Sequence, residues 1–131
     1  MTDANVFGTL QAVPAGERPD LLAAPVLAAL HLIPGVLVAE IDPDYADTEN
    51  LCARYGVPMD ASANAVIVRG TRAGVDRHAC CMTLAHRRVD VNNVVRRRLD
   101  ARKASFAPMD YAVQATGMEY GGINPVGLPA D

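Results

Sequence analysis

The sequence predicts an α/β domain of the α+β kind, with helices flanking a β-sheet. Stretches with apolar residues at helical spacing alternate with short runs rich in Val and Ile, and Gly or Pro residues separate them. The chain has 131 residues, 50% hydrophobic and 21% charged, which suits one domain with one core. This balance excludes a disordered tail and a collagen-like repeat. We therefore expect residues 1–131 to form a single domain.

The first third of the chain contains few regular signals. Residues 1–19 are rich in Pro, Gly and polar side chains, which predicts an irregular lead-in. Residues 20–33 are apolar and rich in Ala, and they predict a helix. Because Pro25 is tolerated only in a first turn, this helix effectively begins near Ala24. Residues 36–41 then predict a short strand.

The middle of the chain has clearer boundaries. Either Asp47 or Thr48 can cap a helix that ends before Gly56. Two strands follow, over residues 64–69 and 77–85, joined by a hairpin-like turn. The second strand is apolar on both sides, so we expect it to be central in the sheet.

Two further helices and a strand are predicted toward the C-terminus. Asp90 caps a helix that runs to about Ala101. Its apolar residues recur at helical spacing and are expected to face the core: Val91, Val94, Val95 and Leu99. A brief strand follows at residues 104–106, and a last helix begins at Pro108 and ends at Gly117.

The charge of the chain is unevenly distributed. Residues 87–103 contain seven basic and two acidic side chains, a net charge of +5. Because the whole chain carries -3, the remainder carries -8. A clustered basic segment on an acidic protein is typical of a surface that binds a phosphate backbone. A solvated helix face gives the same pattern, so both interpretations stay open.

We expect no metal, no other cofactor and no membrane contact. The three Cys and three His residues show no ligand spacing, and no C-x-x-C pair is present. The longest apolar run, residues 21–30, is far shorter than the ~20 residues that a membrane span needs. The N-terminus also lacks the basic start of a secretory signal. These features predict a cytoplasmic protein.

The most informative segment is residues 116–127, which contain four Gly and one Pro. Glycine permits positive φ, so successive backbone N–H groups of this loop can point into one concavity. Such a concavity can hold an anion, a carboxylate or the carbonyl oxygen of an ester. A tight structural turn would have the same composition.

Several motifs together resemble the YbaK/EbsC family, also described as the prolyl-tRNA synthetase associated editing domain. They are a helix ending in Gly56-Val57-Pro58, the strand around Val66, the basic helix opened by Asp90, and T-G followed by G-G-x-x-P-x-G from Thr116. The resemblance covers roughly residues 47–129. It implies a compact α/β domain around a mixed, barrel-like sheet.

The resemblance also implies a function. Members of the family are trans-editing aminoacyl-tRNA deacylases, which hydrolyse the ester between a wrong, small amino acid and its tRNA. The implied partners are aminoacyl-tRNA and prolyl-tRNA synthetase. The implied catalytic residues are Asn64, Gly121 and Gly122. The residues implied to bind the substrate are Ser105, Phe106, Thr116, Pro125 and Gly127. The residues implied to contact tRNA are Arg96, Arg97, Arg102 and Lys103.

Two departures from the family pattern affect these expectations. The family places a Lys at the start of the strand that follows the G-V-P helix, and this chain has Asn64 there. An uncharged Asn permits three readings: a different substrate, a weak deacylase, or a non-catalytic module that binds a tRNA acceptor end or an amino acid. The family domain also continues past the Gly-rich loop, so we expect the chain to be a C-terminally truncated form of a longer domain. An inactive fragment is then a further alternative.

Overall fold

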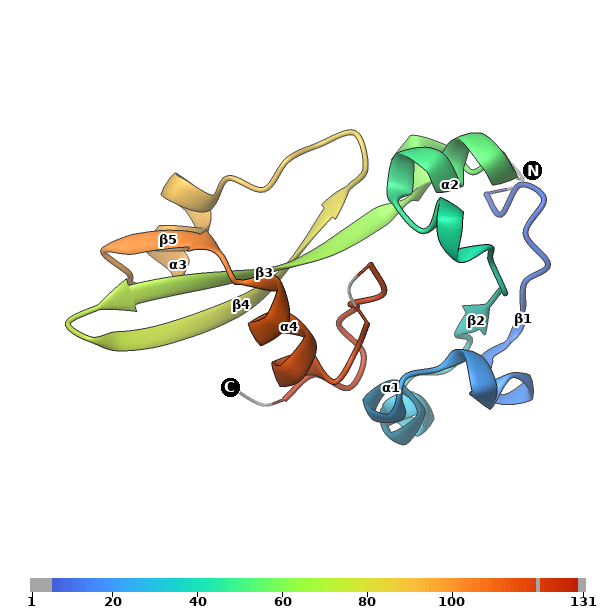
Figure 1. The fold of residues 1–131 in the computed structure, drawn as a ribbon, viewed down its shortest axis with the longest axis horizontal. Helices are drawn as coiled ribbons and strands as arrows, with labels where there is room; N and C mark the ends of the chain where they lie inside the picture. Colours follow the sequence, from blue (N-terminus) through green and yellow to red (C-terminus); the bar gives the residue numbers. More distant parts are fainter. Residues whose placement is uncertain (1–5, 120, 130–131) are drawn as a thin grey trace.

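The computed structural model describes residues 6–119 and 121–129 and confirms the α+β class (Figure 1). The strands are β1 (Val13–Pro14), β2 (Leu37–Val38), β3 (Ala63–Arg72), β4 (Val75–Leu84) and β5 (Lys103–Phe106). The helices are α1 (Ala24–Ala29), α2 (Thr48–Tyr55), a π-helix (Val91–Val95), α3 (Arg96–Arg98) and α4 (Met109–Thr116). Short 3-10 turns lie at Ala15–Glu17, Pro19–Leu21, Leu30–Leu32, Pro43–Tyr45 and Met59–Ala61.

The main sheet has three strands in the order β4-β3-β5, and both pairings are antiparallel. The central strand is therefore β3. Our expectation that residues 77–85 form the central strand is wrong, because among the described strands β4 pairs only with β3 and lies at the edge. Among the described residues both sheets are antiparallel and open, so they do not close as the barrel that the family resemblance implies.

A two-residue turn joins β3 to β4. Ala73 (φ 51°) and Gly74 (φ 78°) both have positive φ, which is the geometry of the turn that matches the twist of paired strands. Beyond the turn, Thr71 faces Asp76, and the Thr71 hydroxyl donates to the carboxylate across 2.8 Å. Both strands consequently run for ten residues and are longer than the sequence predicts.

The predicted helix from Asp90 begins as a π-helix. The Asp90 carboxylate accepts from the N–H of Asn93, as expected of a cap. The N–H of Val95 then bonds the carbonyl of Asp90 five residues earlier. The wider turn rotates the following residues relative to a regular helix. Val95 is therefore buried, but Val94 is 57% exposed, and its predicted core position is wrong.

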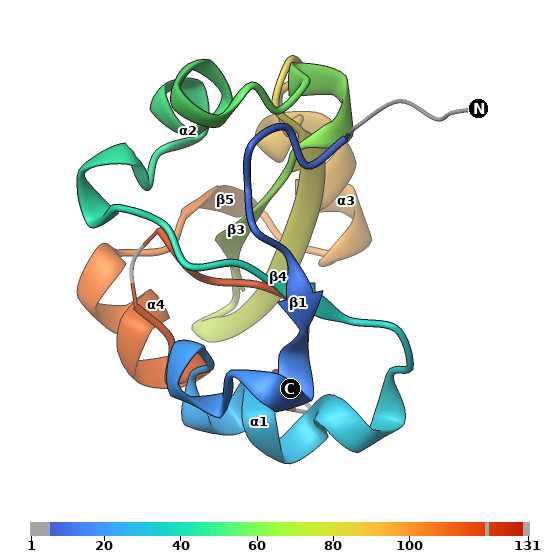
Figure 2. The same ribbon diagram turned by 90° about the vertical axis from the view of Figure 1, so that its right-hand side faces the viewer.

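The N-terminal part is built from short elements. In the predicted irregular lead-in, Val13–Pro14 form β1, which pairs antiparallel with Leu37–Val38 of β2. Residues 1–5 of that lead-in lie outside the described residues. The predicted helix begins at Ala24 as expected, but its α-helical part ends at Ala29. In Figure 2 this part of the chain lies in front of the main sheet.

The main sheet is covered on both faces. On one face, Gly70 of β3 lies against Leu99 and Ala101, which follow α3. On the other face, Tyr111 of α4 stacks on His78 of β4 with ring centroids 4.6 Å apart. The buried core includes residues of these layers and also residues of the N-terminal part and of α2. It is made of small and medium side chains: Ala15, Val26, Cys52, Val68, Val95, Ala101, Ala112 and Met118.

Candidate functional site

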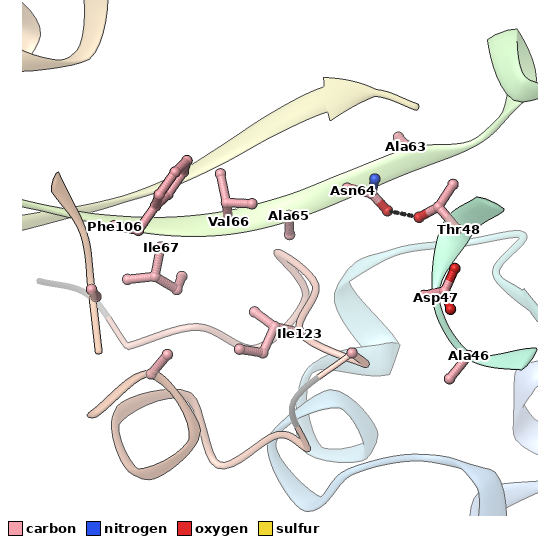
Figure 3. A pocket seen from close by; sticks show the side chains of 13 residues that line it. Ala46, Asp47, Thr48, Ala63, Asn64, Ala65, Val66, Ile67, Phe106 and Ile123 are labelled. Atoms are coloured by element: carbon pink, nitrogen blue, oxygen red, sulfur yellow. Dashed lines mark hydrogen bonds between the residues drawn. The ribbon is translucent and has the colours of Figure 1, made fainter. Parts of the chain in front are cut away.

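A cavity of about 350 Å³ lies at the open edge of β3, and we call it the edge cavity (Figure 3). It exists because β5 pairs with β3 only over Val68–Thr71. The last hydrogen bond between the two segments runs from the N–H of Ala107 to the carbonyl of Ile67, and the earlier residues of β3 have no partner strand on this side among the described residues. The lining comes from the start of α2, from β3, from β5 and α4, and from the C-terminal loop: Ala46, Asp47, Thr48, Ala63, Asn64, Ala65, Val66, Ile67, Phe106, Ala107, Ala112, Gly121 and Ile123.

Asn64 lies half-buried in the wall of the edge cavity. Its carbonyl oxygen accepts a hydrogen bond of 2.5 Å from the Thr48 hydroxyl at the start of α2 (Figure 3). The Nδ2 group is the other end of this amide. No described residue accepts from the Asn64 Nδ2 group, so this donor is available to a ligand. Asn64 is thus an oriented, uncharged donor at the edge cavity.

Asp47 is the only ionisable side chain in the described lining of the edge cavity. It caps α2, because its Oδ1 accepts from the N–H of Asn50 across 3.0 Å and its Oδ2 from the Asn50 side chain. These hydrogen bonds, the backbone one first, lower the pKa of the Asp47 carboxyl. A carboxylate with a lowered pKa is a weak base but a persistent negative charge. Asp47 is therefore better suited to hold a cation than to remove a proton.

The two predicted loop glycines are placed differently. Gly121 (φ 90°) lines the edge cavity, and its N–H has no acceptor among the described residues. The N–H of Gly122 instead donates to the carbonyl of Glu119 across 2.9 Å. Gly122 lines a separate cavity beside α1. Of the two glycines, Gly121 lines the edge cavity. Ile123 is the residue of this loop whose apolar side chain lines the cavity (Figure 3).

Three predicted substrate-binding residues lie outside the edge cavity. The Thr116 hydroxyl is buried and donates to the carbonyl of Ala112 across 2.7 Å. Pro125 is exposed on the loop. Gly127 (φ 78°) lies against the backbone of Pro25, so closely that a Cβ would meet the Pro25 carbonyl oxygen. The part of these three residues in substrate binding remains a prediction. The contacts of Thr116 and Gly127 hold the end of α4 and the loop in place.

Ser105 and Phe106 belong to different cavities. Phe106 is 62% exposed and lines the edge cavity. Ser105 lines a second cavity, of about 610 Å³, which we call the basic cavity. The basic cavity contains three of the four predicted tRNA contacts and one further arginine: Arg96, Arg102, Lys103 and Arg69. The fourth predicted contact, Arg97, is exposed and lies outside this lining.

Sequence reasoning missed three residues of these cavities. It treated Asp47 and Thr48 only as caps, and a cap that also faces a strand cannot be recognised without the tertiary fold. It did not single out Arg69, which faces Ser105 across the sheet. The Arg69 guanidinium lies 4.8 Å from the Tyr111 ring and donates to the His78 ring across 3.3 Å. Arg69 is thereby fixed in place.

In residues 6–119 and 121–129, no group of three or more His, Cys, Asp or Glu side chains is placed to hold a metal ion. In the same part of the chain, no helix is long and apolar enough to cross a membrane.

The described residues thus combine a small cavity lined by polar and apolar groups with a basic cavity, both bordered by the antiparallel main sheet. Comparison with protein families identifies the chain. The family model described as the aminoacyl-tRNA editing domain matches residues 42–131, and the chain belongs to that family. Hydrolysis of aminoacyl-tRNA is the general activity of such editing domains, and aminoacyl-tRNA is their substrate. Searches of curated proteins and of solved structures found no match.

Proposed function

We propose that this protein is a trans-editing deacylase that hydrolyses the ester of a mischarged tRNA in the edge cavity. The observation that carries the proposal is the Asn64 amide in the lining of the edge cavity: Thr48 donates to its oxygen, and its Nδ2 group has no acceptor among the described residues. In the reaction, the Asn64 Nδ2 group donates to the ester carbonyl oxygen. The N–H of Gly121, which also lines the edge cavity, is the second donor. Fixed donors aimed at a developing oxyanion are a major source of rate enhancement in acyl transfer.

The proposed reaction needs no covalent bond to the protein. Water adds to the ester carbonyl carbon, and the resulting oxyanion is held by the two donors. The bond between that carbon and the ribose oxygen then breaks, and the ribose oxygen takes up the proton that the water released. The products are the free amino acid and a tRNA with a free terminal hydroxyl. The neighbouring ribose hydroxyl of the tRNA relays the proton, because Asp47 is a weak base.

The charge of the edge cavity fits the acyl group. An aminoacyl ester carries a free ammonium group next to its carbonyl, and Asp47 supplies a carboxylate in the same lining. The rest of the cavity is formed mostly by short or aliphatic residues such as Ala65, Ala112 and Ile123. A volume of about 350 Å³ lies at the lower end for ligand pockets, which favours a small amino acid.

The basic cavity supplies the tRNA contact in this proposal. Arg96, Arg102 and Lys103 bind backbone phosphates there, and Arg97 adds charge on the adjoining surface. We also propose that residues 1–131 act as one domain in the cytoplasm. Prolyl-tRNA synthetase is the proposed source of the mischarged tRNA.

The test is a deacylation panel. Purified protein is mixed with tRNAs that carry Ala, Ser, Cys or Pro, and the remaining ester is followed over time. At least one ester should disappear faster than in buffer, and the Asn64→Ala protein, prepared identically, controls for contaminating hydrolases. Equal rates with and without protein across the whole panel would contradict the proposal.

A second candidate function is binding without hydrolysis. It is favoured by the uncharged Asn64 at the position of the family Lys and by the occupied N–H of Gly122. A binding module would show saturable, salt-sensitive tRNA binding that Arg96→Glu and Arg97→Glu weaken, while the ester stays intact. The same panel, analysed for both bound and hydrolysed aminoacyl-tRNA, separates the two functions.

A further inference from the structure

A third cavity shares a wall with the edge cavity. It has a volume of about 590 Å³, and we call it the loop cavity because residues 87–92 form much of its lining. Asn64, Val66 and Phe106 line both the edge cavity and the loop cavity. A ligand whose reactive bond lies at Asn64 can therefore extend into both cavities at once.

The two cavities carry opposite charges. The edge cavity contains the carboxylate of Asp47, whereas the loop cavity contains the guanidinium groups of Arg87 and Arg88. Both arginines are exposed, and neither side chain bonds to a described residue. The single carboxylate of the loop cavity, Asp90, accepts from the backbone N–H of Asn93 across 3.1 Å. An aminoacyl ester of RNA has the matching polarity, with an ammonium group on one side of the ester and phosphates on the other.

The shared wall also contains an exposed aromatic ring. Phe106 ends β5 and is 62% exposed, which is unusual for a large apolar side chain that lines two cavities. Unstacked bases at the ends of RNA chains bind proteins by stacking on such rings. The position of Phe106 between the cavities places a stacking surface next to the proposed site of ester cleavage.

Resting on the proposed deacylase function, we propose that the loop cavity binds the single-stranded 3′ end of the RNA. The terminal base stacks on Phe106, and the phosphates that precede it bind Arg87 and Arg88. Asn92 lines both the loop cavity and the basic cavity, so the RNA strand continues from one to the other. The loop cavity is thus the nucleotide side of the substrate, and the edge cavity is its amino acid side.

The first test measures binding of the uncharged RNA trinucleotide CCA, labelled at its 5′ end, by fluorescence anisotropy. The double variant Arg87→Gln, Arg88→Gln should bind about tenfold more weakly, with a salt slope of log K reduced by about 1.4. Arg98→Gln is the matched control, because Arg98 is exposed and outside all three cavities. Phe106→Ala should weaken binding about tenfold and Phe106→Tyr should not. Binding and salt slope of the double variant equal to those of Arg98→Gln would overturn the proposal.

The second test separates the failure of this subsite from the failure of the deacylase function. Hydrolysis is compared between an aminoacyl-adenosine, which lacks phosphate, and the same amino acid on the trinucleotide. The double variant should raise KM about tenfold for the trinucleotide ester only. Equal KM values for wild type and variant, with hydrolysis intact, overturn the subsite and leave the deacylase function standing. If neither ester is hydrolysed but the variant still loses trinucleotide binding, the subsite stands and the deacylase function fails.

Discussion

The edge cavity has two walls that are built in different ways. On the wall formed by α2 and β3, the polar groups are side chains, and each is held by a regular element: Asp47 caps α2, and Thr48 bonds Asn64 of β3. On the wall formed by the C-terminal loop, the side chain that lines the cavity is the apolar Ile123, and polarity comes from the backbone of Gly121. The first wall can place charge and hydrogen bonds with precision, whereas the second shapes the cavity.

The loop wall depends on contacts outside the cavity for its position. Asn124 accepts from the N–H of Val126 across 2.9 Å and donates to the carbonyl of Gly122 across 3.2 Å. Gly127 lies directly on the backbone of Pro25, at the start of α1. Substitutions on the α2 and β3 wall should therefore alter chemistry, because its polar groups are side chains, and substitutions on the loop wall should alter stability.

The largest effect on the α2 and β3 wall should come from Asn64→Ala. Removing one donor to an oxyanion typically lowers kcat by about 100- to 1,000-fold. The melting temperature should change little, because Asn64 is only half-buried. Thr48→Val, which frees the amide to rotate, should give a smaller loss of about tenfold. Single-turnover deacylation measures both, and an Asn64→Ala protein with wild-type kcat would place the donor elsewhere.

The loop wall is tested by Gly127→Ala with Gly121→Ala as its matched control. Both glycines have positive φ, so an Ala strains the backbone at either position. Only at Gly127 does the new Cβ also collide with the Pro25 backbone, whereas at Gly121 it meets open space. We expect Gly127→Ala to lower the free energy of unfolding by about 3 kcal/mol and Gly121→Ala by about 1 kcal/mol. Urea denaturation measures both, and equal losses would show that the Pro25 contact does not hold the loop.

Local sequence signals predicted where the helices next to the edge cavity begin and end. Helix α2 begins after Asp47 and ends at Gly56, as its capping residues predict, and α4 ends at Gly117 in the same way. The turn at Ala73–Gly74 lies within the expected turn over residues 70–74, but it is shorter, because the strands pair up to Arg72 and Val75. These features depend on neighbouring residues, which is why sequence alone places them well.

Features that depend on distant segments were predicted poorly. Strand order is one: the apolar sequence of β4 favours a central strand, but β4 lies at the edge and none of its residues is fully buried. The edge cavity is another, because it joins the start of α2, Asn64 and Gly121, which are far apart in the chain. Family resemblance supplied Asn64 and Gly121 as site residues, but no local pattern could place Asp47 opposite the loop.

A smaller effect is expected from Asp47→Asn. Asn caps a helix about as well as Asp, so α2 should stay intact while the cavity loses its negative charge. We expect KM for aminoacyl-tRNA to rise about fivefold, which is typical of an exposed ion pair. For N-acetylated aminoacyl-tRNA, which has no ammonium group, KM should not change.

The control for this charge effect is Asp44→Asn. Asp44 is an exposed carboxylate close in sequence to Asp47 but outside the edge cavity. Its replacement should leave KM unchanged for both substrates. If Asp47→Asn and Asp44→Asn raise KM equally, the effect reflects overall charge and not a contact with the substrate ammonium group.

The smallest effect concerns the pH dependence of stability, and it tests whether Asp47 caps α2 through its charged form. Hydrogen bonds from Asn50 lower the pKa of Asp47 in the folded protein below its ordinary value of 3.8. The charged cap therefore stabilises the fold at pH values above 3.8, and this contribution is lost as the pH falls through the lowered pKa. Asp47→Asn removes the titration but keeps a capping side chain. The difference in urea midpoint between wild type and Asp47→Asn should shrink as the pH falls from about 6 to about 2.5. A constant difference over that range would mean that the charge of Asp47 contributes nothing to capping α2. Its charge would then act only on the ligand.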